Sequence, residues 1–160
     1  MRITFINSMY EPVLKAVLKQ ILPTPEEQAA IQAKAKELIS KIKQIGGSFV
    51  DVVFVGSAAR GTNLRARKEI DIFILFPEGS EEDILEREGL EIGKKLAQGY
   101  PHTIMHASHP YVKAQIDGYD VDIVPAYKVT SAANIRSAVD RTPFHLKYIC
   151  LLYTSPSPRD

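Results

Sequence analysis

The sequence predicts an α+β fold in which helices cover a sheet. Apolar residues recur at helical spacing between residues 11 and 45. From residue 49 to residue 124, short runs rich in β-branched and aromatic residues alternate with glycine, proline and acidic turn signals. These patterns predict two N-terminal helices, then strands that a further helix interrupts.

Length and composition fit one ordinary globular domain. The chain has 160 residues, of which 45% are apolar, enough for a substantial core. The net charge of +1 means that nucleic-acid binding would need a local basic patch. The single cysteine, Cys150, excludes an intramolecular disulfide framework and fits a reducing cytoplasm. No apolar run is long enough to span a membrane, so no membrane partner is expected.

Two amphipathic helices are predicted before the first strand. The first covers residues 11–22 and ends at Pro23. The second begins after Thr24, which forms a capping box with Glu27, and it ends at Gly46-Gly47. Its apolar face, which is expected to lie on a sheet, contains Ile31, Ala35, Leu38, Ile42 and Ile45.

The first predicted strand, residues 49–55, leads into Gly56 and Ser57. Glycine lets the backbone approach a ligand closely, and a serine hydroxyl can hydrogen-bond a phosphate oxygen. Arg60 is the cation nearest this turn and the stronger candidate for binding a triphosphate. The other cations of the following loop fit a solvated surface equally well: Arg65, Arg67 and Lys68.

Two acids open the second predicted strand, residues 69–76. Side chains alternate along a strand, so Glu69 and Asp71 point to the same side. Neighbouring carboxylates repel each other unless a cation lies between them, and oxygen ligands with an open site suit Mg²⁺ and substrate phosphates. The pattern predicts a metal-dependent nucleotidyl-transfer site. An acid-x-acid pair alone would also fit an edge strand with surface acids.

A helix is predicted from its cap at Ser80 to about Gln98. Three strands follow, the last two joined by a hairpin turn at Asp117-Gly118: residues 102–108, 111–116 and 119–124.

Two acids also lie on one face of the last predicted strand. Asp120 lies beside the turn and fits a solvated acid. Asp122 precedes Ile123-Val124-Pro125, where an unpaired carboxylate would be costly, so it is the candidate third metal ligand.

The histidines His102, His106 and His109 do not share one strand face, and no cysteine accompanies them. They are predicted to be surface or packing side chains and not a metal cluster.

A final helix is predicted to begin at Thr142, its cap, with Pro143 in the first turn. Because free amides at a helix N-terminus bind phosphate, Thr142 and His145 would face such a group. A plain cap is the alternative.

Five segments of this chain match, in order, the motifs of one family: residues 56–60, 69–73, 109–112, 121–125 and 137–145. Together they resemble the archaeal (class I) CCA-adding enzymes, tRNA nucleotidyltransferases of the polymerase-beta-like superfamily, over roughly residues 11–149. The resemblance implies the fold of that superfamily, a mixed sheet covered by helices. It also implies that Glu69, Asp71 and Asp122 hold catalytic Mg²⁺.

The same resemblance implies that Ser57 and Arg60 contact the incoming nucleotide, beside Gly56, and that Thr142 and His145 contact its triphosphate. Similar enzymes add C, C and A from CTP and ATP to the 3′ end of tRNA without a nucleic-acid template. Another polymerase-beta-like nucleotidyltransferase and a non-catalytic nucleotide-binding fragment are the alternatives.

The chain departs from the family's pattern in places. Ala58 stands where an aromatic residue is usual. Residues 1–149 are expected to form the catalytic head domain with the start of the next helix, and the family's C-terminal tRNA-binding domains are expected to be absent. Residues 150–160 contain two prolines and no apolar period, and are expected to be a non-native tail.

Overall fold

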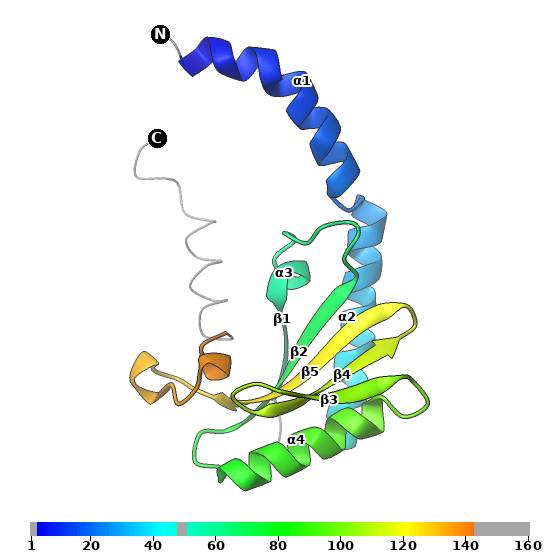
Figure 1. Cartoon of the computed structure of the whole chain (residues 1–160). Helices are drawn as coiled ribbons and strands as arrows, with labels where there is room; N and C mark the ends of the chain where they lie inside the picture. Colours follow the sequence, from blue (N-terminus) through cyan, green and yellow to red (C-terminus); the bar gives the residue numbers. More distant parts are fainter. Residues whose placement is uncertain (1–2, 48–50, 143–160) are drawn as a thin grey trace.

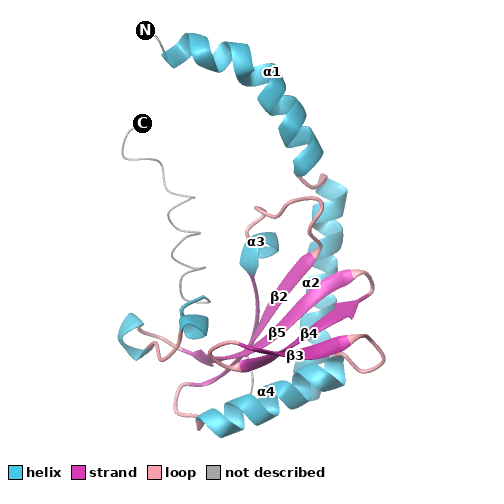
Figure 2. Ribbon diagram, viewed as in Figure 1, coloured by secondary structure: helices cyan, strands magenta, loops and turns pink. Residues whose placement is uncertain are grey.

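A single mixed sheet organises the molecule (Figures 1 and 2). The computed structural model describes residues 3–47 and 51–142. Its five strands lie in the order β1-β2-β5-β4-β3, with β2 and β5 parallel and the other pairs antiparallel. The strands are β1 (Asp51–Val55), β2 (Glu69–Pro77), β3 (His102–His106), β4 (Pro110–Ile116) and β5 (Tyr119–Lys128). The predicted α+β class with a mixed sheet is therefore confirmed.

Two helices cover one face of this sheet. Helices α2 (Pro25–Gly46) and α4 (Glu82–Leu96) contact each other and pack against the central strands. Helix α4 comes close to the sheet because Gly89 and Gly93 face it, so that any Cβ there would press on Pro125 or Val112. The main core lies in this layer and includes Leu38, Ile42, Ile70, Ile72, Ile74, Leu85, Val121 and Ile123.

The opposite face of the sheet carries a smaller apolar cluster. It consists of Val55, Phe73, Leu75, Val124 and Ala126, with Val139 packed against it. The acids of β2 and β5 belong to this same face, because they alternate with the residues that α2 and α4 cover. This face therefore holds the candidate site.

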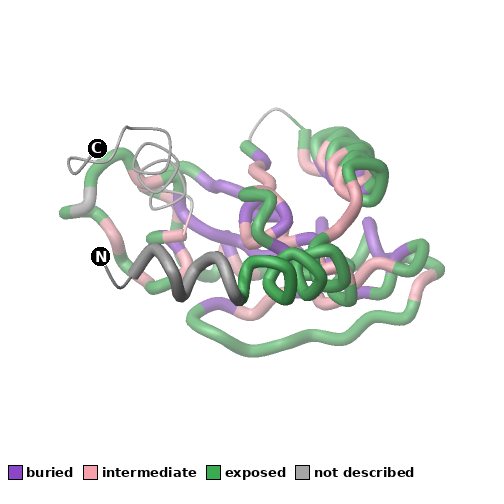
Figure 3. The backbone as a smooth tube through the Cα atoms, turned by 90° about the horizontal axis from the view of Figure 1, so that it is seen from above, coloured by how far each residue is buried: buried purple, intermediate pink, exposed green. Residues whose placement is uncertain are grey.

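Helix α1 (Ile3–Ile21) extends away from the sheet (Figure 1). It begins earlier than the predicted start at residue 11, and Pro12 lies inside it, which removes one intrahelical hydrogen bond without ending the helix. Its large apolar residues from Tyr10 onward are exposed, and this part of the helix is green in Figure 3. They are Tyr10, Val13, Leu14, Val17, Leu18 and Ile21. None of the described helices combines the length and the apolar character that crossing a membrane requires.

Several predicted element ends are confirmed. Thr24 and Glu27 form the capping box of α2, and Gly47 ends that helix with a positive φ of 69°. Asp117 and Gly118 both have positive φ, as the predicted hairpin turn requires.

Other predicted ends are wrong. Helix α4 is preceded by Glu81, which makes no side-chain cap, and not by Ser80. The backbone amide of Ser80 instead donates to Pro77 in a turn that follows β2. Strand β5 continues through Pro125 to Lys128, since Pro125 pairs with Ile74 in the parallel ladder. Strand β3 ends at His106 rather than at residue 108.

The last described helix begins at residue 138, not after Thr142. Ser137 is its cap: the Ser137 hydroxyl accepts from the Asp140 amide, and the Asp140 carboxylate accepts from the Ser137 amide at 2.9 Å. Thr142 was predicted as the cap because Pro143 follows it. The reciprocal hydrogen bonds between Ser137 and Asp140 instead cap the helix earlier in the sequence. Between β5 and this helix lies a short 3₁₀ turn, Ala132–Asn134.

Candidate active site

Strands β2 and β5 bring the predicted acids together. In their parallel register, Asp71 lies beside Asp122 and Glu69 lies beside Asp120. Neighbouring strands are about 4.8 Å apart, so the two aspartates on this face are direct neighbours. The structure thus places Glu69, Asp71 and Asp122 in one cluster.

The electrostatics of this cluster are unfavourable to its ionised form. Burial raises the pKa of Asp71 to about 6, and the negative charges of Asp122 and Glu69 add to that shift. Burial also raises the pKa of Asp122, against the opposing effect of the Lys113 ammonium. A polyvalent cation at this position would relieve the repulsion.

Two further observations fit a hard cation such as Mg²⁺ here. The Oδ1 atom of Asp122 is buried and has no hydrogen-bond partner. The nearest cation, the Lys113 Nζ, stands 3.5 Å away, which is an ion pair and not a short hydrogen bond. The donors on this face are carboxylate oxygens, the ligands that Mg²⁺ prefers.

Lys113 is a residue of the site that the sequence analysis missed. It lies on β4 next to Asp122 in the sheet, and the Asp122 charge raises the pKa of its ammonium. Strand alternation could have indicated Lys113, because Tyr111, Lys113 and Gln115 alternate with the buried side chains of β4.

The predicted glycine-serine turn borders the acids. Val55, the last residue of β1, pairs with Asp71, and the next residues form the one-turn helix α3 (Gly56–Ala59). A Cβ on Gly56 would overlap the Asp71 carboxylate, so only glycine lets the chain turn this close to it. Ser57 follows and is half-buried.

Helix α2 fixes the position of this turn. The side-chain amides of Gln28 and Gln32 each donate to the Ala58 carbonyl at 3.0 Å. The turn is therefore held from the helical layer and from β2 at once.

The cations of the loop after the turn divide into two groups. Arg60 is exposed, and its charge lowers the pKa of Asp71, opposing the shift from burial. Arg65 binds Glu27 of α2, and Arg67 binds Glu69, each at 2.9 Å. Arg60 thus remains the candidate nucleotide contact, while Arg65 serves to tie the loop to α2.

The predicted triphosphate contacts are only partly placed. Thr142 is half-buried in the helix that begins at residue 138. His145 lies outside the described residues. Asp140, which is fully buried, positions this helix by accepting hydrogen bonds from the Tyr127 amide at 2.8 Å and from Ser137.

The three histidines do not gather at the acids. His102 and His106 are exposed on β3, as predicted. His109 is buried just before β4, close to Glu82 and Glu86 of α4.

Comparison with known proteins shows what this chain is similar to. The sequence model described as "Nucleotidyltransferase domain" matches residues 35–145. The chain is 47% identical over 147 residues to a CCA-adding enzyme of Methanocaldococcus jannaschii, covering 87% of this chain and 32% of that protein. It is 43% identical over 139 residues to one of Archaeoglobus fulgidus, covering 87% of this chain and 31% of that protein. The chain therefore spans about a third of the length of these relatives.

Solved structures share the fold at lower identity. The E. coli MS115-1 CdnC structure with ATP has a TM-score of 0.63 at 19% identity, over 89% of this chain and 51% of that one. The Cid1 poly(U) polymerase with Mg and 3′-dATP has a TM-score of 0.60 at 19% identity, over 72% of this chain and 36% of that one.

Proposed function

We propose that this chain, which belongs to the nucleotidyltransferase domain family, carries the site that transfers nucleotides from CTP and ATP to the 3′ end of tRNA. The observation that most supports this proposal is the cluster of Glu69, Asp71 and Asp122 on the less covered face of the sheet, next to Gly56-Ser57. The relatives named CCA-adding enzyme support the choice of substrate.

In this proposal, Glu69, Asp71 and Asp122 hold Mg²⁺. Magnesium bound at such carboxylates lowers the pKa of an attacking hydroxyl and stabilises the charge of a leaving pyrophosphate. The reaction forms a bond from the tRNA 3′-oxygen to the α-phosphorus and breaks the bond between that phosphorus and the pyrophosphate oxygen. The acids position the metal and do not themselves transfer the proton.

The remaining site residues bind the nucleotide. Gly56 leaves room beside Asp71, and Ser57 and Arg60 lie on the adjoining turn, where a hydroxyl and a guanidinium suit phosphate oxygens. Thr142, in the helix that begins at residue 138, and His145 would contact the triphosphate. Lys113 forms an ion pair with Asp122. Were Asp122 to bind metal instead, the Lys113 ammonium would be available to bind a phosphate oxygen.

The test is nucleotide incorporation into tRNA that lacks its CCA end, with labelled CTP and ATP and Mg²⁺. We expect incorporation by the unaltered chain and none by Asp122→Asn. Asp120→Asn, which changes the neighbouring acid beside the turn, is the matched control and should keep most of the activity. Undiminished incorporation by Asp122→Asn, or none by the unaltered chain, would contradict the proposal.

Acceptor competition separates the alternatives. If a small molecule or a protein side chain is labelled in preference to tRNA, the chain is a nucleotidyltransferase of another kind. If nucleotide binds but no acceptor is labelled, it is a non-catalytic nucleotide-binding fragment.

A further inference from the structure

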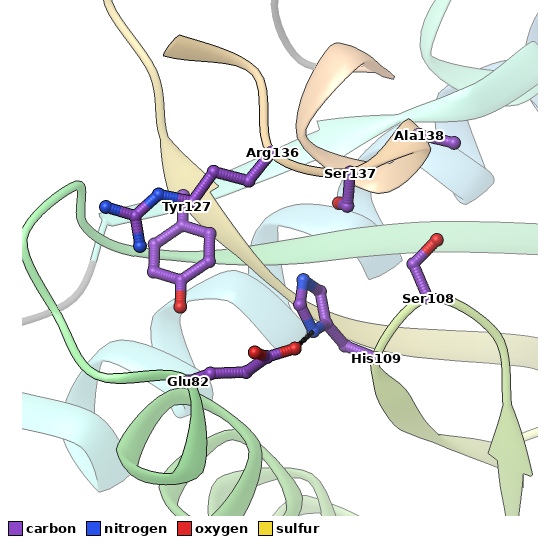
Figure 4. A pocket seen from close by; sticks show the side chains of 7 residues that line it. All are labelled: Glu82, Ser108, His109, Tyr127, Arg136, Ser137 and Ala138. Atoms are coloured by element: carbon purple, nitrogen blue, oxygen red, sulfur yellow. Dashed lines mark ion pairs between the residues drawn. The ribbon is translucent and has the colours of Figure 1, made fainter.

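A second cluster of metal-ligating side chains lies away from the proposed active site. Glu82 and Glu86 are one turn apart on α4, and His109 stands just before β4 (Figure 4 shows Glu82 and His109). The His109 Nδ1 lies 3.5 Å from Glu86 Oε1 and 3.7 Å from Glu82 Oε1. One ligand atom from each of the three residues lies within 4.8 Å of the other two.

The His109 ring makes this cluster more than a group of surface acids. The residue is only 3% exposed, and neither ring nitrogen has a hydrogen-bond partner. Leaving a buried polar group unpaired is energetically unfavourable, so a ligand for the ring is expected. The ring points into a cavity of about 450 Å³, together with the Tyr127 hydroxyl, which is also buried and unpartnered (Figure 4).

This cavity is distinct from the site of the catalytic acids. Tyr127 and Asp122 are both on β5, but their side chains belong to opposite faces of the sheet. They are also five residues apart, about 16 Å along an extended strand. A metal held by His109 could not be one of the metals held by Asp71 and Asp122.

We propose that Glu82, Glu86 and His109 form a binding site for a divalent transition-metal cation such as Zn²⁺. An imidazole with two carboxylates suits zinc and its neighbours, whereas Mg²⁺ prefers oxygen ligands alone. Zinc bonds of about 2.0–2.2 Å in tetrahedral geometry place ligand atoms about 3.3–3.6 Å apart. The separations of His109 Nδ1 from the two carboxylates, 3.5 and 3.7 Å, therefore already approach those of a filled site.

The surroundings fit a cation with an open coordination position. With three protein ligands, the fourth position faces the cavity, where a water could hydrogen-bond the Tyr127 hydroxyl. The Arg136 guanidinium opposes a cation, but it lies over the Tyr127 ring, 4.8 Å from its centre, and the two carboxylates outweigh its charge.

Zinc binding to the whole chain tests this inference. The titration is made calorimetrically with chelator-treated protein in the Asp71→Asn background, so that the catalytic acids do not contribute a site. We expect one Zn²⁺ per chain, and Co²⁺ in its place should give the visible absorption of a low-coordinate N/O site. Because even outer-shell changes weaken metal affinity about 10–100-fold, Glu86→Gln should raise the Kd at least tenfold.

Two further variants guard the interpretation. Glu82→Gln, at an exposed residue, should also weaken binding at least tenfold, and its melting curve without metal should match the parent's. His106→Gln removes an exposed histidine outside the cluster and should leave the Kd unchanged. Unchanged zinc affinity in both glutamate variants, or no saturable binding in the parent, would overturn the inference, and the cluster would then be only a contact between an imidazole and two carboxylates.

Discussion

At the scale of single residues, Gly56 controls the approach of the turn to Asp71. Its φ is +79°, and a Cβ would overlap the Asp71 carboxylate. Gly56→Ala should therefore cost about 1–2 kcal/mol from the left-handed backbone and also displace Asp71, which weakens Mg²⁺-dependent nucleotide binding. Thermal melting and calorimetric titration of CTP measure the two effects.

Gly61 provides the matched control for that substitution. It also has a positive φ, +69°, but a Cβ there would meet nothing within 4 Å. Gly61→Ala should lose similar stability and keep its nucleotide affinity. Equal nucleotide affinity in both alanine variants would show that the Gly56 contact does not matter to the site.

The raised pKa of Asp71 predicts a pH dependence of stability in the absence of metal. Its folded value of about 6 exceeds the usual 3.8, so the folded chain holds this proton more tightly than the unfolded chain. The stabilising contribution is fully present below about pH 4 and is lost as the pH rises through 6. Urea unfolding at pH 5 and at pH 7.5 measures it, with magnesium removed.

Asp71→Asn isolates this contribution. The variant should lose less stability between pH 5 and pH 7.5 than the parent does, because it removes the group that titrates in this range. Asp83→Asn, at an exposed acid of α4, should keep the parent's pH dependence. If Asp71→Asn and the parent change in parallel, then burial of Asp71 and repulsion from Asp122 and Glu69 do not raise its pKa as the structure indicates.

At the scale of elements, the last described helix depends on one buried carboxylate. Asp140 accepts hydrogen bonds from the Tyr127 amide and from Ser137, and so attaches the helix start to the end of β5. Asp140→Ala should lower the free energy of unfolding by about 1–3 kcal/mol, since the Tyr127 amide is then buried without a partner. Ser137→Ala, which keeps the Tyr127 contact, should cost less. Equal and negligible losses in urea unfolding would contradict this role.

Local patterns predicted the elements better than their ends. The capping box of Thr24 and Glu27 and the turn at Asp117-Gly118 were predictable because each is a short sequence with one favoured geometry. The start of the last helix was not, because two capping patterns overlap there and the buried Asp140 selects the earlier one. Strand β5 was predicted too short because Pro125 reads as a break, yet a parallel partner accommodates it.

The candidate site was partly predictable for the same reason. Strand alternation alone puts Glu69 and Asp71 on one side. That Asp122 lies beside Asp71 depends on the parallel pairing of β2 with β5, which no local pattern encodes. The sequence indicated Asp122 through its expected burial and through the family resemblance. The contacts of Lys113 with Asp122 and of His109 with Glu86 depend on which elements are neighbours in the fold, so the sequence alone did not reveal them.

At the scale of the whole molecule, the two proposed binding sites belong to opposite faces of the sheet. The helix-covered face contains the main core and, at its edge, the Glu82–Glu86–His109 cluster. The opposite face presents the acid cluster, bordered by the Gly56 turn and by the helix that Asp140 holds in place. Nucleotide affinity is therefore expected to depend on residues of the second face and zinc affinity on residues of the first.

The most direct test of the central claim is calorimetric titration of CTP and of ATP, with and without Mg²⁺, into the chain and into Asp71→Asn. We expect saturable binding of both nucleotides that requires Mg²⁺ and is lost in Asp71→Asn. A melting curve on the same sample establishes that the chain is folded. Absence of nucleotide binding by a folded chain, or binding that neither Mg²⁺ nor Asp71 affects, would contradict a metal-dependent nucleotidyl-transfer site at Glu69, Asp71 and Asp122.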